Sequence, residues 1–273
     1  MKRASSRWAT ALVSLVAAIW IVPIIGIVMT SLRPADEAIL GWWTAGKFTL
    51  TFDAWQRVWT QYPLLSAFWV SLKLAGLATI ATMLLAPAAA YAFHYLRFPL
   101  RRTILIVIVN AFVLPQQVVI IPLFQLWREW GLIDTIFAVL IPYVGLSFAW
   151  SIVVVKNFLE AFPRELIEAA RIDGCGPIAT FGRVVLPNML APVCAVGSLQ
   201  FLWTWNALLL PLLYLRSQIP LPVALARIAG AFDASWNLRA AAAIITAIVP
   251  LVVFIVFQRQ FAGGALSRSG SKE

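Results

Sequence analysis

The side chains that could do chemistry are concentrated in one polar segment, residues 162–192, which lies between two long apolar runs. Its charged residues follow one another closely: Arg164, Glu165, Glu168, Arg171, Asp173 and Arg183. No catalytic set of nucleophile and base or of paired carboxylates accompanies them. Such charges can form ion pairs within the chain or with a partner. Two interpretations are therefore open: a helical hairpin that lies on the inner leaflet of a membrane, or a unit that docks on a cytoplasmic partner.

The spacing within this segment predicts two short helices joined by a glycine turn. Residues 164–172 are rich in helix formers. Arg164 and Glu168 are four positions apart, so their charges can pair along one face. After Asp173, Gly174 suits the left-handed position that ends a helix. Pro177 then begins a second short helix, since proline is favoured at the first helical position.

The sequence contains no nucleotide-binding loop of the form Gly-x-x-x-x-Gly-Lys-Ser/Thr. The run Gly174-Cys175-Gly176 is too short to cradle a phosphate, and no lysine follows it. Cys175 and Cys194 fall in or beside a segment placed inside the cell, so no disulfide is expected. His94 has no second metal ligand nearby and is interpreted as a polar residue at the end of a span. We therefore expect no cofactor, and no ATP hydrolysis, on this chain.

Polar side chains within the apolar runs are candidates for a substrate pathway. Amides and aromatic faces suit a neutral sugar, through hydrogen bonds and through stacking on C–H surfaces. The alternative is that the amides bond between helices, and the sequence leaves both open. The candidates are Asn110, Gln116, Gln117, Gln200, Trp205 and Asn206.

The composition indicates a membrane protein. Apolar residues make up 62% of the 273 and charged residues 12%, whereas a soluble domain is about 25% charged. The net charge of +10 could indicate nucleic-acid binding, but the basic residues fall between the apolar runs. That distribution is typical of the loops of a membrane protein, so no nucleic-acid partner is expected.

A transmembrane helix needs about 20 predominantly apolar residues, and six runs approach or exceed this length. They cover about residues 9–32, 66–93, 103–126, 135–156, 190–213 and 240–258. The first run also resembles a secretory signal, but it is longer than the apolar region of a signal, which has about 7–15 residues. The predicted fold is therefore an all-α integral membrane protein with six spans in one transmembrane domain over residues 1–273.

The distribution of Lys and Arg predicts the orientation. If the N-terminus lies on the cytoplasmic side of the membrane, 13 of the 21 basic residues fall in cytoplasmic (inner) segments and seven in external (outer) segments. The remaining one, Lys73, lies in or near a span. Both termini and the polar segment are then cytoplasmic. The inner set is Lys2, Arg3, Arg7, Arg97, Arg101, Arg102, Lys156, Arg164, Arg171, Arg183, Arg259, Arg268 and Lys272; the outer set is Arg33, Lys47, Arg57, Arg128, Arg216, Arg227 and Arg239.

The polar segment resembles the EAA motif of permease subunits of ATP-binding-cassette (ABC) importers: EAA, three residues, G, nine residues, I, one residue, LP. The matching residues are Glu168, Ala169, Ala170, Gly174, Val184, Leu186 and Pro187, with valine in place of isoleucine. Residues 115–142, 205–212 and 258–264 also resemble the sugar branch of this family, in particular the maltose-type second permease.

The resemblance implies a bacterial inner-membrane subunit that pairs with a homologous permease. Two ATPase subunits would bind inside and an extracytoplasmic solute-binding protein outside, with membrane lipids around the spans. Residues 160–187 would then form a coupling loop that docks in a cleft of the ATPase. Within it, Glu168 would offer a charge to a basic group, Gly174 would permit the turn after Asp173, and Ala169 and Ala170 would allow close approach.

Other functions remain as alternatives to a sugar importer. A permease of the same superfamily could carry an amino acid, a peptide or phosphate. An ion-coupled secondary transporter is a different class, and such proteins tend to carry functional charges within their spans. Lys73 is the one charge well inside a predicted span, so this alternative is disfavoured. A membrane-embedded enzyme would need a catalytic set that the sequence lacks.

Overall fold

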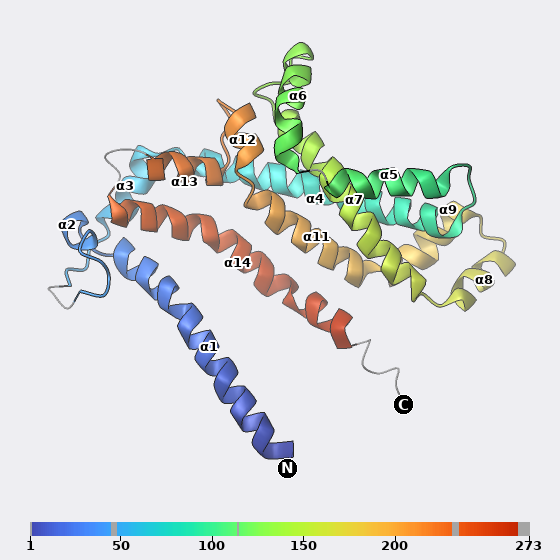
Figure 1. The fold of residues 1–273 in the computed structure, drawn as a ribbon, viewed down its shortest axis with the longest axis horizontal. Coiled ribbons are helices and arrows are strands. Elements are labelled where there is room, and N and C mark those ends of the chain that lie inside the picture. The colour runs from blue at the N-terminus through green and yellow to red at the C-terminus, as the bar shows by residue number, and fades with distance from the viewer. Residues whose placement is uncertain (1, 45–47, 114, 231–234, 267–273) are drawn as a thin grey trace. The chain divides into compact units, whose positions relative to one another are not determined.

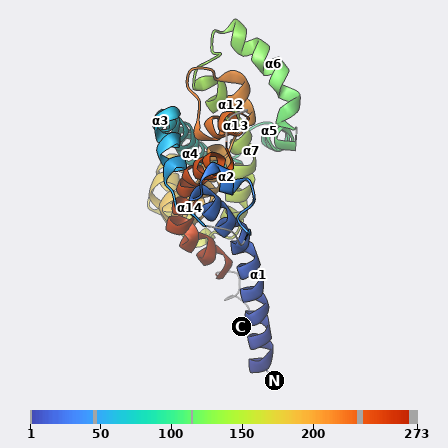
Figure 2. The same ribbon diagram turned by 90° about the vertical axis from the view of Figure 1, so that its left-hand side faces the viewer.

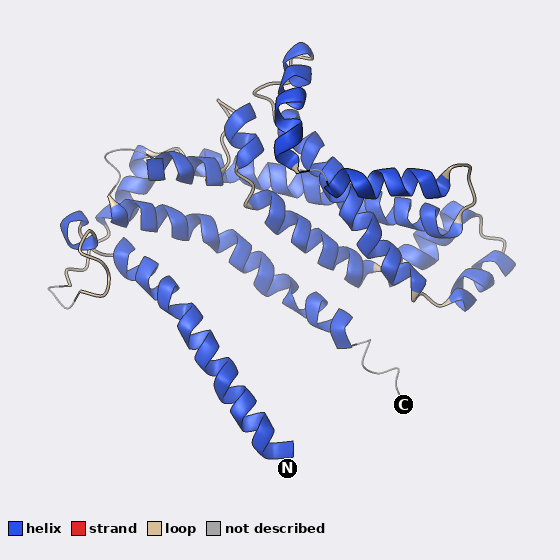
Figure 3. Cartoon of the chain, in the orientation of Figure 1, coloured by secondary structure: helices blue, strands red, loops and turns tan. Residues whose placement is uncertain are grey.

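The computed structural model describes residues 2–44, 48–113, 115–230 and 235–266, and within these ranges every regular element is a helix (Figure 1). Figure 3 shows helices and loops only. The helices are α1 (Lys2–Ser31), α2 (Ala35–Ala38), α3 (Asp53–Gln61), α4 (Leu64–Tyr95), α5 (Arg101–Val113), α6 (Gln116–Glu129), α7 (Phe137–Glu160), α8 (Arg164–Ile172), α9 (Pro177–Thr180), the π-helix η1 (Phe181–Val185), α10 (Leu186–Asn188), α11 (Leu190–Trp205), α12 (Leu209–Tyr214), α13 (Leu221–Gly230) and α14 (Trp236–Leu266). Lys47, Arg268 and Lys272, used above for the orientation, lie outside the described residues.

Four helices contain stretches long and apolar enough to cross a membrane: Arg7–Ser31 of α1, all of α4, all of α7 and Trp236–Val256 of α14. Two further pairs of helices have this character but are bent. The axes of α5 and α6 differ by 100°, and those of Pro177–Asn188 and α11 differ by 76°. The described helices therefore provide four spans, or up to six if each bent pair counts as one.

The bends fall near the third and fifth predicted spans. Figure 2 shows α6 turned steeply away from α5. Pro115, just before α6, has an extended backbone with φ −60° and ψ 131°, and proline cannot continue a preceding helix without losing a backbone hydrogen bond. The predicted span 190–213 contains both α11 and α12, separated by residues 206–208. The third and fifth predicted spans are therefore not continuous helices.

The chain divides into two compact units. The first comprises residues 1–67 and 223–249. Its polar centre is Arg33, which follows α1 and is 3% exposed. The Arg33 guanidinium donates to the carbonyl of Gly41 at 3.1 Å and lies over the ring of Phe48. Asn237 at the start of α14 donates to the Arg33 carbonyl at 2.9 Å, so this residue ties two distant parts of the chain together.

The second unit comprises residues 68–222 and 250–273 and contains the polar segment. One apolar cluster joins α4, α7 and α11 to the polar segment: Ala86, Ala90, Tyr91, Phe93, Ile152, Val155, Leu159, Ile167, Val185, Met189, Val193 and Val196. Another contains Leu74, Trp127, Ala138, Val139, Tyr143, Leu210, Tyr214 and Leu215. Between α4 and α7, the hydroxyls of Thr82 and Ser147 form a buried hydrogen bond of 2.8 Å. The helices of this unit thus give the polar segment a packed base.

Candidate functional site

The first half of the polar segment folds as predicted. Helix α8 covers Arg164–Ile172 and ends at Asp173. Gly174 has φ +79°, and the N–H of Cys175 donates to the Ala170 carbonyl at 2.9 Å. This backbone hydrogen bond closes the helix through a left-handed residue, the conformation that glycine adopts without strain.

The second half is a helical stretch of mixed geometry. It begins at Pro177 after an extended Gly176, and α9 passes into η1 and then α10. Thr180 Oγ1 donates to the Gly176 carbonyl at 3.1 Å. Asn188 Nδ2 donates to the carbonyl of Val184 at 2.7 Å. A single π turn inside a helix is unusual and often occurs at a functional site, and here it lies within the EAA-like motif.

The two faces of this helix–turn–helix differ in burial. Ile167, Ala170 and Val185 are buried, and Ile167 and Val185 belong to the apolar cluster with α4, α7 and α11. By contrast, Ile172 is 86% and Ile178 is 88% exposed. A hollow of about 560 Å³ opens beside Ile178, and its lining is Gly176, Pro177, Ile178, Ala179, Gly182 and Arg183. The segment is therefore seated on the spans by one face and exposes Ile172 and Ile178 elsewhere.

The motif residues divide between these two faces. Glu168 and Ala169 are exposed on α8, as are Asp173 and Gly174 in the turn. In the second half, Val184 and Leu186 are half-buried and Pro187 is exposed. The pairing of Glu168 with Arg164 or Arg171, which the spacing allowed, is not among the ion pairs of the described residues. The carboxylate of Glu168 therefore remains accessible to a group from outside the chain.

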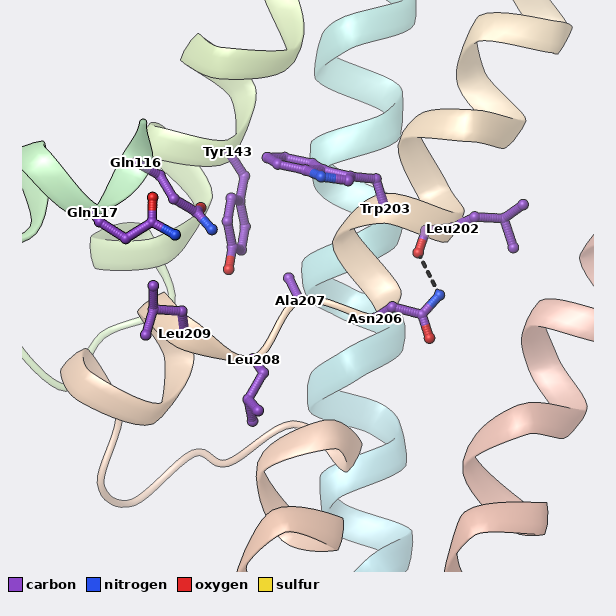
Figure 4. Close-up of a pocket in the computed structure, with 9 residues that line it drawn as sticks. All are labelled: Gln116, Gln117, Tyr143, Leu202, Trp203, Asn206, Ala207, Leu208 and Leu209. Carbon is purple, nitrogen blue, oxygen red and sulfur yellow. Dashed lines mark hydrogen bonds between the residues drawn. The ribbon is translucent and has the colours of Figure 1, made fainter. Parts of the chain in front are cut away.

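A second candidate site is a pocket of about 590 Å³ between α6, α7, α11 and the start of α12 (Figure 4). Its lining combines three amides, two aromatic rings and small apolar side chains: Gln116, Gln117, Tyr143, Leu202, Trp203, Asn206, Ala207, Leu208 and Leu209. Gln116 Oε1 is shielded from solvent and has no hydrogen-bond partner among the described residues. A ligand hydroxyl could donate to this oxygen once the Gln116 amide turned toward the pocket.

The structure brings three of the six predicted pathway residues to this pocket: Gln116, Gln117 and Asn206. The other three lie elsewhere. Asn110 is exposed on α5 and donates to the Ile106 carbonyl. Gln200 is buried and donates to Thr204 within α11. Trp205 is 1% exposed and packs against the rings of Phe68 and Phe201.

Two aromatic residues of the pocket were not among the predicted site residues. The rings of Tyr143 on α7 and Trp203 on α11 are 5.2 Å apart in an edge-to-face arrangement. For Trp203 a signal existed in the sequence, because Trp203, Asn206 and Ala207 fall three and four positions apart and so share one face of a helix. Trp205 falls on a different face. For Tyr143 we find no comparable signal.

Comparison with known proteins agrees with this geometry. Residues 83–264 match the family described as binding-protein-dependent transport system inner membrane component. An osmoprotective compounds uptake permease protein of Synechocystis sp. is 33% identical over 263 residues, covering 93% of this chain and 88% of the relative. A lactose transport system permease protein of Rhizobium radiobacter is 31% identical over 255 residues, covering 93% and 92%.

Among solved structures, a chain of a bacterial ABC transporter involved in the import of the polysaccharide alginate superimposes with a TM-score of 0.78. The sequence identity is 21%, and the match covers 94% of this chain and 96% of that one. The prediction of an ABC-importer permease from the EAA-like motif is therefore confirmed, and the fold is that of such a permease. The chain belongs to the family of inner membrane components of binding-protein-dependent transport systems.

Proposed function

We propose that this protein is one of two permease subunits of an ATP-driven importer, and that residues 160–187 dock on a cytoplasmic ATPase subunit. The observation that carries this proposal is the exposure of Ile172 and Ile178, at 86% and 88%, on a segment whose other face packs on the spans through Ile167 and Val185. Exposed apolar surface rimmed by polar groups marks an interaction site. The buried Ile167 and Val185 would pass a displacement of the docked segment to α4, α7 and α11.

The motif residues have distinct roles in this proposal. The exposed Glu168 would pair with a basic group of the ATPase, and Ala169 would let its backbone approach closely. Gly174 would keep the turn after Asp173 tight. Val184, Leu186 and Pro187 would hold the second half of the segment against the fifth span.

The complete assembly, as we propose it, contains a homologous second permease, two ATPase subunits and an extracytoplasmic solute-binding protein. In this assembly the chain crosses the membrane six times, with both termini in the cytoplasm. The family to which it belongs is defined by dependence on a binding protein, which supports the outer partner. ATP would be bound and hydrolysed on the ATPase subunits, and this chain would hold no cofactor.

The proposed cargo is a sugar or oligosaccharide. The 590 Å³ pocket supports it, since Gln116, Gln117 and Asn206 line it together with the rings of Tyr143 and Trp203, although the Asn206 amide N–H is already donated to the Leu202 carbonyl. Its size lies within the range of small-molecule sites, about 300–1,000 Å³. Similar proteins are named for lactose transport and for alginate import. The similarity to an uptake permease for osmoprotective compounds favours a second candidate, another small polar solute, ahead of an amino acid, a peptide or phosphate.

Charge reversal on α8 tests the docking proposal. Glu168→Lys should lower ATP-driven uptake strongly in the reconstituted complex, because reversing a charge at an interface costs several kcal/mol. Glu165→Lys is the matched control, since Glu165 is also exposed on α8 but lies outside the motif. Equal uptake by both variants, with the ATPases still bound, would refute docking through Glu168. Uptake driven by a proton or sodium gradient without an ATPase would refute the importer itself.

A further inference from the structure

A basic pocket lies where α4 ends and α5 begins, against α8. Its volume is about 450 Å³, and its lining is His94, Tyr95, Arg97, Arg101, Arg164, Ile167, Glu168 and Arg171. The lining therefore contains four arginines and one glutamate, and their formal charges sum to +3 when His94 is neutral. Like charges held this close repel one another, so the pocket is suited to an anion from outside the chain.

No carboxylate of the described residues forms an ion pair with the arginines of this pocket. Ion pairs within the described ranges join Arg57 to Asp53 and Lys156 to Glu160, and none involves an arginine of the pocket. Arg101 Nη1 donates to the Leu96 carbonyl at 2.9 Å, which fixes one guanidinium but does not cancel its charge. Guanidinium groups bind phosphate oxygens with two parallel hydrogen bonds, so this set is matched to a phosphate.

A second observation at the same pocket is independent of charge. The hydroxyl of Tyr95 is shielded from solvent and has no hydrogen-bond partner among the described residues. Its ring is held by the imidazole of His94, with centroids 4.5 Å apart, and by the ring of Tyr91 at 5.2 Å. An unpaired buried hydroxyl is unfavourable. A phosphate bound in the pocket would accept this hydrogen bond once the Tyr95 side chain turned its hydroxyl toward it, because the oxygen is shielded in this structure.

The position of the pocket indicates which phosphate it receives. Helix α4 ends at Tyr95 and α5 begins at Arg101, and the turn between them includes Leu100 with φ 58°. Arg97 lies in the turn and Arg101 is the first residue of α5, so both stand at the ends of apolar helices, where we expect a span to leave the hydrocarbon and meet the headgroups. Basic pockets between transmembrane helices at this depth bind anionic headgroups.

We propose that this pocket binds the phosphate of an anionic phospholipid headgroup. Because α8 contributes Arg164 and Arg171, the bound headgroup would tie the polar segment to the bilayer. The pocket shares Arg164, Glu168 and Arg171 with the proposed docking segment, but the proposal rests only on the membrane setting of that segment and does not require Glu168 to pair with the ATPase. Its test therefore uses lipid binding as the readout, and its failure is distinguishable from failure of transport.

The test uses the whole complex in nanodiscs of phosphatidylglycerol or of phosphatidylcholine. Native mass spectrometry after mild extraction counts the phosphatidylglycerol retained. Arg97→Gln should reduce the affinity for phosphatidylglycerol about tenfold, since it removes a charge-assisted pair. Tyr95→Phe, which deletes one oxygen atom and keeps the fold, should reduce it severalfold. Arg128→Gln is the matched control, because Arg128 is exposed at the end of α6 and outside the pocket.

Thermal unfolding gives a second readout, because a ligand that binds the folded state raises its stability. Phosphatidylglycerol should raise the Tm of the wild type and the control, but raise that of Arg97→Gln less. Equal lipid retention by the wild type and Arg97→Gln would overturn the proposal. So would full stabilisation by inorganic phosphate in phosphatidylcholine discs, which would identify a free-phosphate site. Loss of the ATPase from Arg97→Gln with unchanged lipid retention would instead identify a protein partner.

Discussion

Oδ1 of Asp134 accepts a hydrogen bond from the backbone N–H of Arg216 at 2.7 Å, across 82 positions of sequence. The same oxygen accepts the N–H of Ser217 at 2.9 Å. The N–H of Asp134 donates to the carbonyl of Tyr214 at 2.9 Å, and its φ of 64° is one that aspartate tolerates better than most residues. One side chain thus joins the loop before α7 to the loop after α12, the two helices that contribute Tyr143 and Leu209 to the 590 Å³ pocket.

This relationship predicts a dependence of stability on pH. Hydrogen bonds from the backbone N–H groups of Ser217 and Arg216 hold the pKa of Asp134 below its ordinary value. The carboxylate therefore contributes fully above its unfolded pKa, about 3.9, and this contribution is lost as the pH falls through the lower folded pKa. Asp134→Asn should be less stable than the wild type near neutral pH and should lose less stability on acidification. Thermal unfolding of the purified complex from neutral to acid pH measures this, and equal slopes for the two proteins would contradict it.

The turn of the polar segment offers a prediction with an internal control. Neither Gly174 nor Gly176 has a neighbouring atom within 4 Å of the position that a Cβ would occupy, but Gly174 has φ +79° and Gly176 has φ −68°. Gly174→Ala should therefore cost about 1–2 kcal/mol of left-handed strain, whereas Gly176→Ala should cost little. Hydrogen exchange over residues 164–188 should be faster in the first variant alone. If hydrogen exchange over this segment were equally fast in Gly174→Ala and Gly176→Ala, a side chain at position 174 would not strain the turn.

The exposed and buried isoleucines of the segment should respond differently to the same change. Ile178→Ser should leave the Tm nearly unchanged and weaken association with the ATPase, because Ile178 contacts little within the chain. Ile167→Ser should lower the Tm, since it removes a buried side chain and leaves a cavity at a cost of several kcal/mol. Co-purification of the ATPase and thermal unfolding measure the two effects. Unchanged ATPase recovery with Ile178→Ser would remove the apolar surface from the docking interface.

The polar segment could be predicted in detail because its signals are local. A capping glycine, a proline at a first turn and a run of helix formers fixed the bounds of α8 and the start of α9. The spans carry no such signals. Pro23, Pro87, Pro142 and Pro250 all lie inside helices, whereas Pro115 lies where α5 and α6 part. The neighbouring helices decide which prolines are tolerated, and these neighbours are not apparent from local sequence.

The pocket was the harder part to predict, for a related reason. A helix that is apolar all round gives no indication of which face meets lipid and which meets protein. Gln116, Gln117 and Asn206 line one pocket, but the Asn206 amide N–H donates to the Leu202 carbonyl of α11, and Gln200 likewise donates within α11. Contacts between residues far apart in sequence, such as that of Tyr143 with Trp203, decide this division.

Two tryptophans of α11 separate binding from stability. Trp203 lines the pocket, whereas Trp205 is buried against Phe68 and Phe201. Trp205→Ala should lower the stability of the complex by about 3–5 kcal/mol, the usual cost of truncating a buried tryptophan. Trp203→Ala should leave the Tm close to that of the wild type but raise the KM for uptake, because a sugar would lose a stacking surface. Thermal unfolding and uptake over a range of solute concentrations measure both. A lower Tm with unchanged KM in Trp203→Ala would assign that ring to packing and remove the pocket from the pathway.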